Sequence, residues 1–288
     1  MFLARRKDSQ PTTLSRMRLP RLSTTRAWRR ARRTLVALAV AGLLLIQLGV
    51  PAAGAGLFGL ALLAVILLES ARLHRGIRES ERQQHALIQI RPLLGELPLD
   101  FSGWAADPVT VHNAVRLVVE TRPGLVVECG SGNSTVVIAR CLRALGRGRI
   151  ISLDHDPAYA GRTTELLRRY GVDDLATVVA APLVARQADG QVVQWYGPQY
   201  EPLLQVPIDV LLVDGPPGAS SKLARYPAVP ILQPHLAPTC SILLDDGDRV
   251  DERTIAPLWA HALGATLSYL EGGRGGWLLR RQGPPLSS

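Results

Sequence analysis

The stretch that decides the fold of this chain reads VVECGSGNST and spans residues 126–135. An apolar run enters it, and a helix-compatible segment, 136–145, follows it. Glycine lets the backbone approach a ligand where a Cβ atom would collide, and the first N–H groups of a helix lack intrahelical partners. This order therefore predicts a strand, a ligand-binding turn at 130–132 and a helix capped by Ser134 or Thr135.

Short apolar runs and helical segments alternate on both sides of this turn. Upstream, the valines of 109–121 repeat at helical spacing, which predicts an amphipathic helix. Near-continuous apolar strands that alternate with helices are typical of an α/β fold with a parallel sheet covered on both faces. The last two runs are separated by a glycine-rich gap too short for a helical crossover, so they should pair antiparallel. Seven strands are predicted, at 125–127, 150–153, 177–179, 208–213, 241–244, 265–270 and 276–281.

The first third of the chain has a different composition. The net charge of +9 is unevenly placed, because Asp8 is the single acidic residue within 5–33, which is rich in arginine. Pro11 and Pro20 would interrupt a helix there. We therefore expect residues 1–33 to be a disordered basic arm. Its charges stand directly before an apolar run, which favours contact with a membrane and argues against nucleic acid as a partner.

Residues 34–68 carry no charge at all. As one helix they would span about 50 Å, far more than the ~30 Å hydrocarbon core of a bilayer. The sequence VPAAGAG at 50–56 breaks the segment, so we expect a transmembrane hairpin with helices at 34–50 and 52–68. Arginines flank both ends, which places both ends in the cytoplasm under the positive-inside rule. A single tilted span stays open, whereas the second apolar half argues against a cleaved signal peptide.

Residues 69–102 are expected to form a helical stalk and a linker, because polar, helix-compatible residues give way there to Pro92, Gly95 and Pro98. The folded domain would then span 103–283. Three cysteines without metal-ligand spacing suit a reducing compartment and are expected to be small buried side chains. We therefore expect attachment to the inner (plasma) membrane, with the folded domain in the cytoplasm.

The second predicted strand ends in the acidic segment LDHD at 153–156. Asp154 lies 24 positions after Gly130, where nucleotide-binding α/β folds place a carboxylate for the ribose hydroxyls. A carboxylate can accept hydrogen bonds from both hydroxyls of a cis-diol. Asp154 is therefore predicted to bind a cofactor, and Asp156 to cap the next helix. His155 either touches the cofactor or stands exposed in the loop.

Three aspartates follow two other predicted strands. Asp214 comes after the fourth strand, and Asp245 and Asp246 come at the end of the fifth. Because the carboxyl ends of parallel strands meet at the ligand-binding edge of a sheet, we expect the three carboxylates to cluster as candidate catalytic residues. They could hold Mg²⁺, serve as a general base or substrate contact, or form salt bridges with Arg225 or Arg249.

From about residue 103 to 281 the chain resembles the class I S-adenosylmethionine-dependent methyltransferases, especially the methyltransferase 24-like subgroup. The resemblance implies a Rossmann-like sheet of seven strands with an antiparallel last strand, and S-adenosylmethionine as cofactor. The segments that carry it are VECGSGNS at 127–134, ISLDHD at 151–156, VDGPPG at 213–218, ARYPA at 224–228 and LDD at 244–246.

The same resemblance assigns roles to residues of the predicted turn and strand ends. Glu128 and Gly130 would contact the methionine part of the cofactor, Asp154 its ribose, and segment 179–183 would flank the adenine. The implied cofactor-binding residues are Glu128, Gly130, Ser131, Gly132, Ser134, Asp154, His155, Ala181 and Asp214. A looser similarity to catechol-type methyltransferases would make Asp214, Asp245 and Asp246 ligands of Mg²⁺. Gly247 falls where that type has a third ligand, Asn, which weakens this implication.

The sequence thus predicts a membrane-anchored methyltransferase that transfers a methyl group from S-adenosylmethionine to an unidentified acceptor. The anchor makes the lipid bilayer a partner and suggests a membrane-associated lipid, glycan or protein as acceptor, although a small molecule stays open. An NAD(P)-dependent oxidoreductase is one alternative, but Thr135 stands where its third glycine would be expected. A non-catalytic membrane scaffold that retains the fold is the other.

Overall fold

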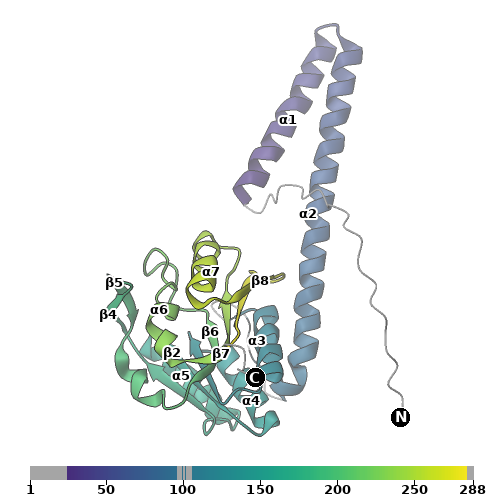
Figure 1. Ribbon diagram of the computed structural model, residues 1–288. Coiled ribbons are helices and arrows are strands. Elements are labelled where there is room, and N and C mark those ends of the chain that lie inside the picture. The colour runs from purple at the N-terminus through teal and green to yellow at the C-terminus, as the bar shows by residue number, and fades with distance from the viewer. Residues whose placement is uncertain (1–24, 96–98, 100, 102–105, 284–288) are drawn as a thin grey trace, which may run out of the picture. The chain divides into compact units, whose positions relative to one another are not determined.

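The computed structural model describes residues 25–95, 99, 101 and 106–283 (Figure 1). Most of the predicted basic arm lies outside these residues. The chain divides between Gly76 and Ile77 into two compact units. The second unit thus begins before residue 103, where the sequence suggested that the folded domain starts.

The first unit contains helix α1 (Thr25–Gln47) and the first part of helix α2 (Pro51–Leu94), which lie side by side (Figure 1). The chain turns at 48–50, where Gly49 adopts a φ of 83°. Pro51 is the first residue of α2, a position where its missing N–H group costs no hydrogen bond. The sequence analysis expected the break over 50–56, but the glycines of that run lie inside α2.

Small residues let α1 and α2 approach each other closely. A Cβ atom on Gly42 would lie 2.7 Å from the backbone nitrogen of Phe58 and 2.8 Å from the carbonyl oxygen of Gly54. Ala61, further along α2, is buried. Such small-residue contacts allow helices to associate by backbone packing, as they do in membranes.

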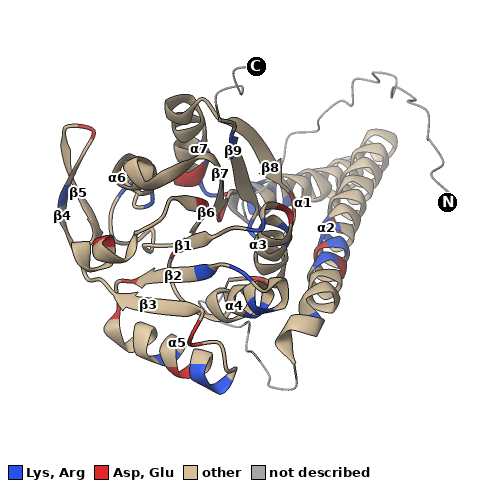
Figure 2. Cartoon of the chain, turned by 60° about the horizontal axis from the view of Figure 1, so that its bottom comes forward, with Lys and Arg blue, Asp and Glu red and all other residues tan. Residues whose placement is uncertain are grey.

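Helix α2 is the one helix among the described residues that is long and apolar enough to cross a membrane, judged by length and composition alone. Its large apolar side chains are exposed, with Leu60 at 68% and Leu67 at 61%. Charged residues begin at Glu69, and Figure 2 shows this change along α2 from tan to alternating blue and red bands. The apolar part of α1, from Thr34 to Gln47, is shorter.

The second unit contains the predicted seven-stranded sheet, in the order β3-β2-β1-β6-β7-β9-β8. The first five strands in this order are parallel, and β9 runs antiparallel to both of its neighbours, which confirms the predicted sheet. The strands are β1 (Leu125–Cys129), β2 (Arg149–Asp154), β3 (Ala176–Ala180), β6 (Ile208–Val213), β7 (Leu236–Asp245), β8 (Thr266–Leu270) and β9 (Gly276–Arg281).

Helices cover both faces of this sheet (Figure 1). Because side chains alternate along a strand, Val126 of β1 packs with the helices on one face and Val127 with those on the other. The first face carries α3 (Pro108–Thr121), α4 (Asn133–Leu145) and α5 (Pro157–Arg169). The second face carries α6 (Ala228–Leu232) and α7 (Val250–Leu263). Burial on both faces explains why the central strands are apolar throughout.

A small hairpin was not anticipated from the sequence. Strands β4 (Leu183–Ala188) and β5 (Gln191–Tyr196) pair antiparallel around a turn in which Asp189 and Gly190 both have positive φ. A 3₁₀ helix, η1 (Pro198–Leu203), follows, and η2 (Gln233–His235) lies before β7. Three aromatic side chains of the β5–η1 segment are fully buried against the sheet: Trp195, Tyr196 and Tyr200.

The last part of α2 belongs to the second unit. Ile90 is fully buried in a cluster with Ala106, Val111 and Val137. The carboxylate of Glu79 accepts a hydrogen bond of 2.7 Å from the N–H group of Gly273 in the β8–β9 turn. Residues 77–94, for which the sequence suggested a helical stalk and linker, are therefore structural members of the folded domain. The three cysteines are buried and free, as expected.

Candidate active site

The glycine turn is fixed against the neighbouring strand β6. Gly130 has a φ of 100°, a conformation that glycine adopts without strain. The carbonyl oxygen of Cys129 accepts hydrogen bonds from the N–H groups of Asp214 (2.9 Å) and Gly215 (2.7 Å). A Cβ atom on Gly130 would lie 3.4 Å from the nitrogen of Gly215. The turn and Asp214 therefore lie directly beside each other at the carboxyl edge of the sheet.

The buried side chain of Glu128 stabilises this turn. One of its carboxylate oxygen atoms accepts hydrogen bonds of 2.6 Å from the hydroxyl groups of Thr135 and Ser152. Burial raises the pKa of Glu128, while hydrogen bonds from these hydroxyls and from Ser134 oppose the rise. The carboxylate thus joins β1, β2 and the start of α4. Its contact with the cofactor, which the family resemblance implies, stays a prediction.

The helix after the turn starts earlier than the sequence suggested. Helix α4 begins at Asn133, so the cap position is Gly132, and neither Ser134 nor Thr135 occupies it. The hydroxyl of Thr135 instead accepts a 3.1 Å hydrogen bond from the N–H group of Gly132, from inside the first helical turn. A Cβ atom on Gly132 would meet nothing within 4 Å, so this side of the turn is open to a ligand.

Asp154, at the end of β2, is 5% exposed and holds the turn from the other side. One carboxylate oxygen accepts hydrogen bonds from the N–H (3.2 Å) and hydroxyl (2.6 Å) groups of Ser131. The other accepts a 3.0 Å hydrogen bond from the N–H group of Asp156. Asp156 caps α5, as predicted, by accepting a 2.8 Å hydrogen bond from the N–H group of Ala158.

Two further predicted cofactor residues stand beside Asp154. The ring of His155 is 37% exposed, and its Nδ1 atom lies 3.6 Å from the carboxylate of Asp154. The N–H group of Ala181, just beyond β3, donates a 2.7 Å hydrogen bond to the carbonyl oxygen of Asp154. The ends of β1, β2 and β3 therefore bring the predicted cofactor residues to one edge of the sheet.

The three predicted aspartates do cluster. One oxygen atom from each of Asp214, Asp245 and Asp246 lies within 4.8 Å of the others. Asp245 and Asp246 are almost fully buried, whereas the side chain of Asp214 is 30% exposed. Burial and the neighbouring carboxylate of Asp245 raise the pKa of Asp214 well above its usual range, although Arg225 opposes the rise. Asp214 is therefore the most accessible acid of the cluster.

Arginines surround these acids, which agrees with the salt-bridge alternative. The buried guanidinium of Arg225 lies 3.0 Å from the carboxylate of Asp214 and 2.7 Å from that of Asp246. Arg249 lies 3.0 Å from the same oxygen atom of Asp246. Arg274 lies 3.1 Å from the other oxygen atom of Asp246 and 3.9 Å from Asp245.

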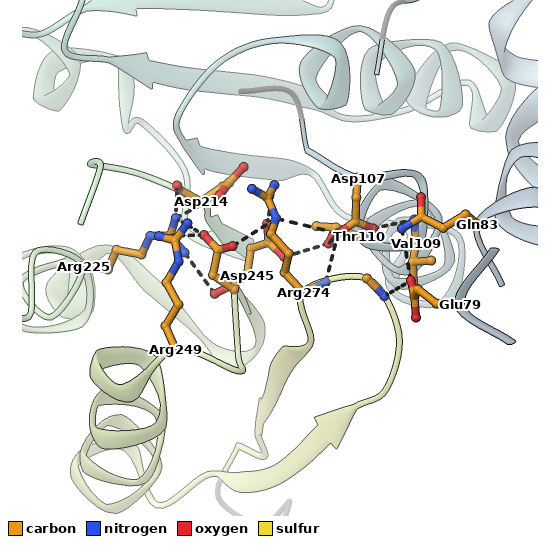
Figure 3. A network of polar contacts seen from close by, with 12 residues as sticks. Glu79, Gln83, Asp107, Val109, Thr110, Asp214, Arg225, Asp245, Arg249 and Arg274 are labelled. Carbon is orange, nitrogen blue, oxygen red and sulfur yellow. Dashed lines mark hydrogen bonds and ion pairs between the residues drawn. The ribbon is translucent and has the colours of Figure 1, made fainter. Parts of the chain in front are cut away.

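The sequence reasoning missed the contribution of α3, which Figure 3 shows. The hydroxyl of Thr110 donates a 2.7 Å hydrogen bond to the carboxylate of Asp245. Asp107 caps α3 by accepting hydrogen bonds from the N–H groups of Val109 and Thr110, and it also accepts one of 3.3 Å from the N–H group of Arg274. The signal for Asp107 was present, since Asp followed by Pro is typical of a helix start.

The residues around the aspartates do not fit a magnesium ion. Mg²⁺ requires about six oxygen atoms in near-octahedral geometry at about 2.1 Å. Here a guanidinium nitrogen of Arg225 contacts two of the three carboxylates. At Gly247, a Cβ atom would lie 2.8 Å from the backbone nitrogen of Gly276, so no larger side chain can supply a further ligand from that position.

The residues around the glycine turn do fit S-adenosylmethionine. The open side of Gly132 and the carboxylate of Asp154 can receive a molecule that carries a ribose diol. The hydroxyl of Tyr196 is buried without a hydrogen-bond partner in the described part of the chain, and it contacts Gly215 beside the turn. A polar atom that is buried and unsatisfied in this way is a site for a ligand hydrogen bond.

A cavity also lies away from the glycine turn and the aspartates. It has a volume of about 640 Å³ and lies at the opposite edge of the sheet, among residues such as Gly124, Arg149 and Asp209. Ligands of parallel α/β sheets bind at the carboxyl ends of the strands, and this cavity lies at their amino ends. We therefore place the active site at the glycine turn and the aspartate cluster.

Comparison with known proteins agrees with this placement. Residues 127–247 match the family model described as a methyltransferase domain. No curated protein matches the chain in sequence.

Similar solved structures are distant in sequence. SAH-bound methyltransferase PaMTH1 of Podospora anserina is 15% identical, with 74% of this chain and 96% of that chain covered and a TM-score of 0.47. An O-methyltransferase of Bacillus cereus in complex with SAH is 15% identical (69% and 90% covered, TM-score 0.44). The O-methyltransferase TomG of Streptomyces achromogenes, in complex with SAM, is 18% identical (71% and 90% covered, TM-score 0.44). The family match and the geometry of the turn together show that residues 127–247 carry a methyltransferase domain and that the chain is an S-adenosylmethionine-dependent methyltransferase.

Proposed function

We propose that this enzyme is attached to the cytoplasmic face of the inner (plasma) membrane and methylates a hydroxyl group of an acceptor held at that membrane. The observation that carries the proposal is the position of Asp214. It follows β6, it is hydrogen-bonded through its N–H group to the end of β1, and it lies beside Gly130 of the cofactor turn. A base at this point can reach an acceptor that faces the cofactor.

Methyl transfer requires little covalent chemistry from the protein. S-adenosylmethionine supplies an activated methyl group when it is bound, and the protein aligns the acceptor and removes its proton. Burial raises the pKa of Asp214, which makes its carboxylate a stronger base than an exposed one. Its partial exposure of 30% leaves room for an acceptor hydroxyl, whereas Asp245 is engaged by Thr110. We therefore assign the role of general base to Asp214.

The membrane part of the proposal rests on the first unit. Exposed apolar side chains cover the first half of α2 and the second half of α1. Arg29, Arg30, Arg32 and Arg33 precede the apolar region, and Arg72 and Arg75 follow it. Two short spans with arginines on both flanks give a hairpin whose ends both lie in the cytoplasm. An enzyme anchored in this way meets lipids, lipid-linked glycans and membrane proteins at high local concentration.

The topology can be tested with reporter fusions. Alkaline phosphatase fused after Gly49 should be active, because the turn between α1 and α2 lies outside the cytoplasm in a hairpin. The same reporter fused after Arg82 should be inactive, and a fluorescent reporter there should be bright. Equal behaviour of the two fusion sites would contradict the hairpin and favour a peripheral or single-span attachment.

The activity can be tested without knowing the acceptor. Purified enzyme in detergent is incubated with membranes of its host and S-adenosylmethionine labelled in the methyl group. We expect label in the lipid-extractable or membrane-protein fraction, and we expect mild alkali to leave it in place, since a methyl ether resists hydrolysis and a methyl ester does not. Label that alkali releases would show a carboxyl acceptor, and label confined to the water-soluble fraction would contradict a membrane acceptor.

A further inference from the structure

We infer that Arg225 takes the place of a divalent cation in this active site, so that the enzyme transfers methyl groups without a metal. The inference deepens the proposed function, since it concerns the acids that would receive the acceptor. It starts from the position of the guanidinium group. One of its nitrogen atoms lies 3.0 Å from the carboxylate of Asp214 and 2.7 Å from that of Asp246, two of the three clustered acids.

Arg225 is also bound to the backbone of both strands that carry these acids. The same nitrogen atom donates to the carbonyl oxygen of Asp214 at 2.5 Å, and the second terminal nitrogen donates to that of Asp245 at 3.0 Å. The planar guanidinium thus bridges the ends of β6 and β7 with fixed geometry, which an ammonium group of lysine does not reproduce. The side chain is 3% exposed, so it is part of the domain interior and not a surface ion pair.

The charges close to Arg225 explain why a cation is needed. Asp214, Asp245, Asp246 and Glu252 bring four carboxylates to one place, and the last three are almost fully buried. Carboxylates at such short distances repel one another unless a cation or a proton lies between them. Glu252 lies 3.6 Å from the second terminal nitrogen of Arg225. Arg249 and Arg274, which are about 40% exposed, approach Asp246 from outside.

The backbone next to the acids leaves no place for a further protein ligand at residue 247. Gly247 follows Asp246, and a Cβ atom there would lie 2.8–3.0 Å from three backbone atoms of Gly276 in β9. The hydroxyl of Thr110 already donates to the carboxylate of Asp245. Thr110 and Arg225 thus donate a hydrogen bond to one carboxylate oxygen of each of the three clustered acids.

This arrangement has a consequence for the acceptor. A metal ion can bind two neighbouring oxygen atoms of one substrate, whereas both terminal nitrogen atoms of Arg225 already donate to protein carboxylates and carbonyls, and its Nε atom is buried. The acceptor would then be held by a hydrogen bond from one hydroxyl group to Asp214. We therefore infer an acceptor that needs only a single hydroxyl group and no vicinal pair of hydroxyls.

Manganese binding tests the inference without the acceptor. The full-length protein in detergent, freed of metals, is titrated with Mn²⁺, and the free ion is counted by electron paramagnetic resonance. We expect the unaltered protein to leave the Mn²⁺ signal as it is in buffer up to about 1 mM, a concentration at which weak oxygen-ligand sites become occupied. The matched control is Arg249→Met, which removes an outer arginine from Asp246 and should behave in the same way.

Arg225→Met should create a site, because it uncovers the acids and keeps most of the side-chain volume. We expect about one Mn²⁺ to bind per chain, and we expect the double variant Arg225→Met/Asp246→Asn to lose it. A folded Arg225→Met protein that binds no Mn²⁺ would overturn the claim that Arg225 fills the place of a cation. Folding is checked by thermal unfolding; if this variant does not fold, the unaltered protein decides the question alone.

Two results with the unaltered protein would overturn the inference directly. One is stoichiometric Mn²⁺ binding that Asp246→Asn abolishes. The other is loss of labelled methyl transfer in EDTA with recovery in Mg²⁺, where we expect less than a twofold change. If no membrane fraction accepts label but the Mn²⁺ titrations behave as expected, the proposed acceptor is wrong and the role of Arg225 stands.

Discussion

Replacing Asp214 with asparagine should lower the rate of methyl transfer about 10²- to 10⁴-fold, the range that a general base contributes. Asparagine keeps an oxygen atom for the 3.0 Å contact with Arg225, and the backbone contacts of residue 214 do not depend on its side chain. The fold and the affinity for S-adenosylmethionine should therefore change little. Initial rates with labelled cofactor and calorimetric titration with S-adenosylmethionine measure the two quantities separately.

The matched control is Asp209→Asn in β6, the strand that Asp214 follows. Asp209 accepts hydrogen bonds from the N–H groups of Gly124 and Leu125 at the opposite edge of the sheet, which asparagine can also accept. Its variant should transfer methyl groups at the rate of the unaltered enzyme. If Asp214→Asn is fully active, and the double variant Asp245→Asn/Asp246→Asn is as well, the acids are structural and another group must deprotonate the acceptor.

Replacing Asp154 with alanine should weaken the binding of S-adenosylmethionine roughly 10- to 100-fold. The loss of charge-assisted hydrogen bonds costs about 1.5–3 kcal/mol. The structure gives two reasons for the effect, because Asp154 is the carboxylate placed for the ribose diol and it also fixes Ser131 of the turn by two hydrogen bonds. Calorimetry of the folded variant measures the affinity.

Two matched variants separate these reasons. Ser131→Ala removes the hydroxyl contacts with Asp154 (2.6 Å) and Thr163 (3.0 Å) but keeps the carboxylate of Asp154, so its effect should be smaller than that of Asp154→Ala. Asp156→Ala removes the cap of α5, which should lower the free energy of unfolding by about 1 kcal/mol without changing the affinity. Unchanged affinity in a folded Asp154→Ala variant would remove Asp154 from the cofactor site.

The sheet could be predicted from the sequence because its central strands are buried on both faces. Runs such as 208–213 are then apolar throughout, and the glycine turn marks where the chain leaves β1 for α4. The short gap of 271–275 similarly predicted the antiparallel pair of β8 and β9. The hairpin of β4 and β5, which forms a separate two-stranded sheet, was not predicted because most of its side chains are partly or fully exposed and several are polar.

The extent of helix α2 also could not be predicted. The sequence suggested a linker near Pro92, but α2 continues through Pro92 to Leu94, and Ile90 in its last part is buried in the core. The break between α1 and α2 lies at 48–50, before most of the segment 50–56 in which the sequence suggested it. Glycines at 54 and 56 permit a break, yet Gly54 is used instead for close packing against α1.

The cluster of aspartates could be predicted from strand ends, but its partners could not. Arg225 lies only 11 and 21 positions from Asp214 and Asp246, and it was one of several open alternatives. Thr110 lies 135 positions from Asp245, and only the packing of α3 against the sheet brings the two together. The choice between a metal ion and arginine depends on such distant contacts.

The central claim is that the turn at 130–132, together with Asp154, binds S-adenosylmethionine. Its most direct test is calorimetric titration of the unaltered protein with S-adenosylmethionine and, separately, with NAD. We predict saturable binding of one S-adenosylmethionine per chain, with an affinity that Asp154→Ala lowers, and no binding of NAD. Saturable binding of NAD together with none of S-adenosylmethionine would contradict the account.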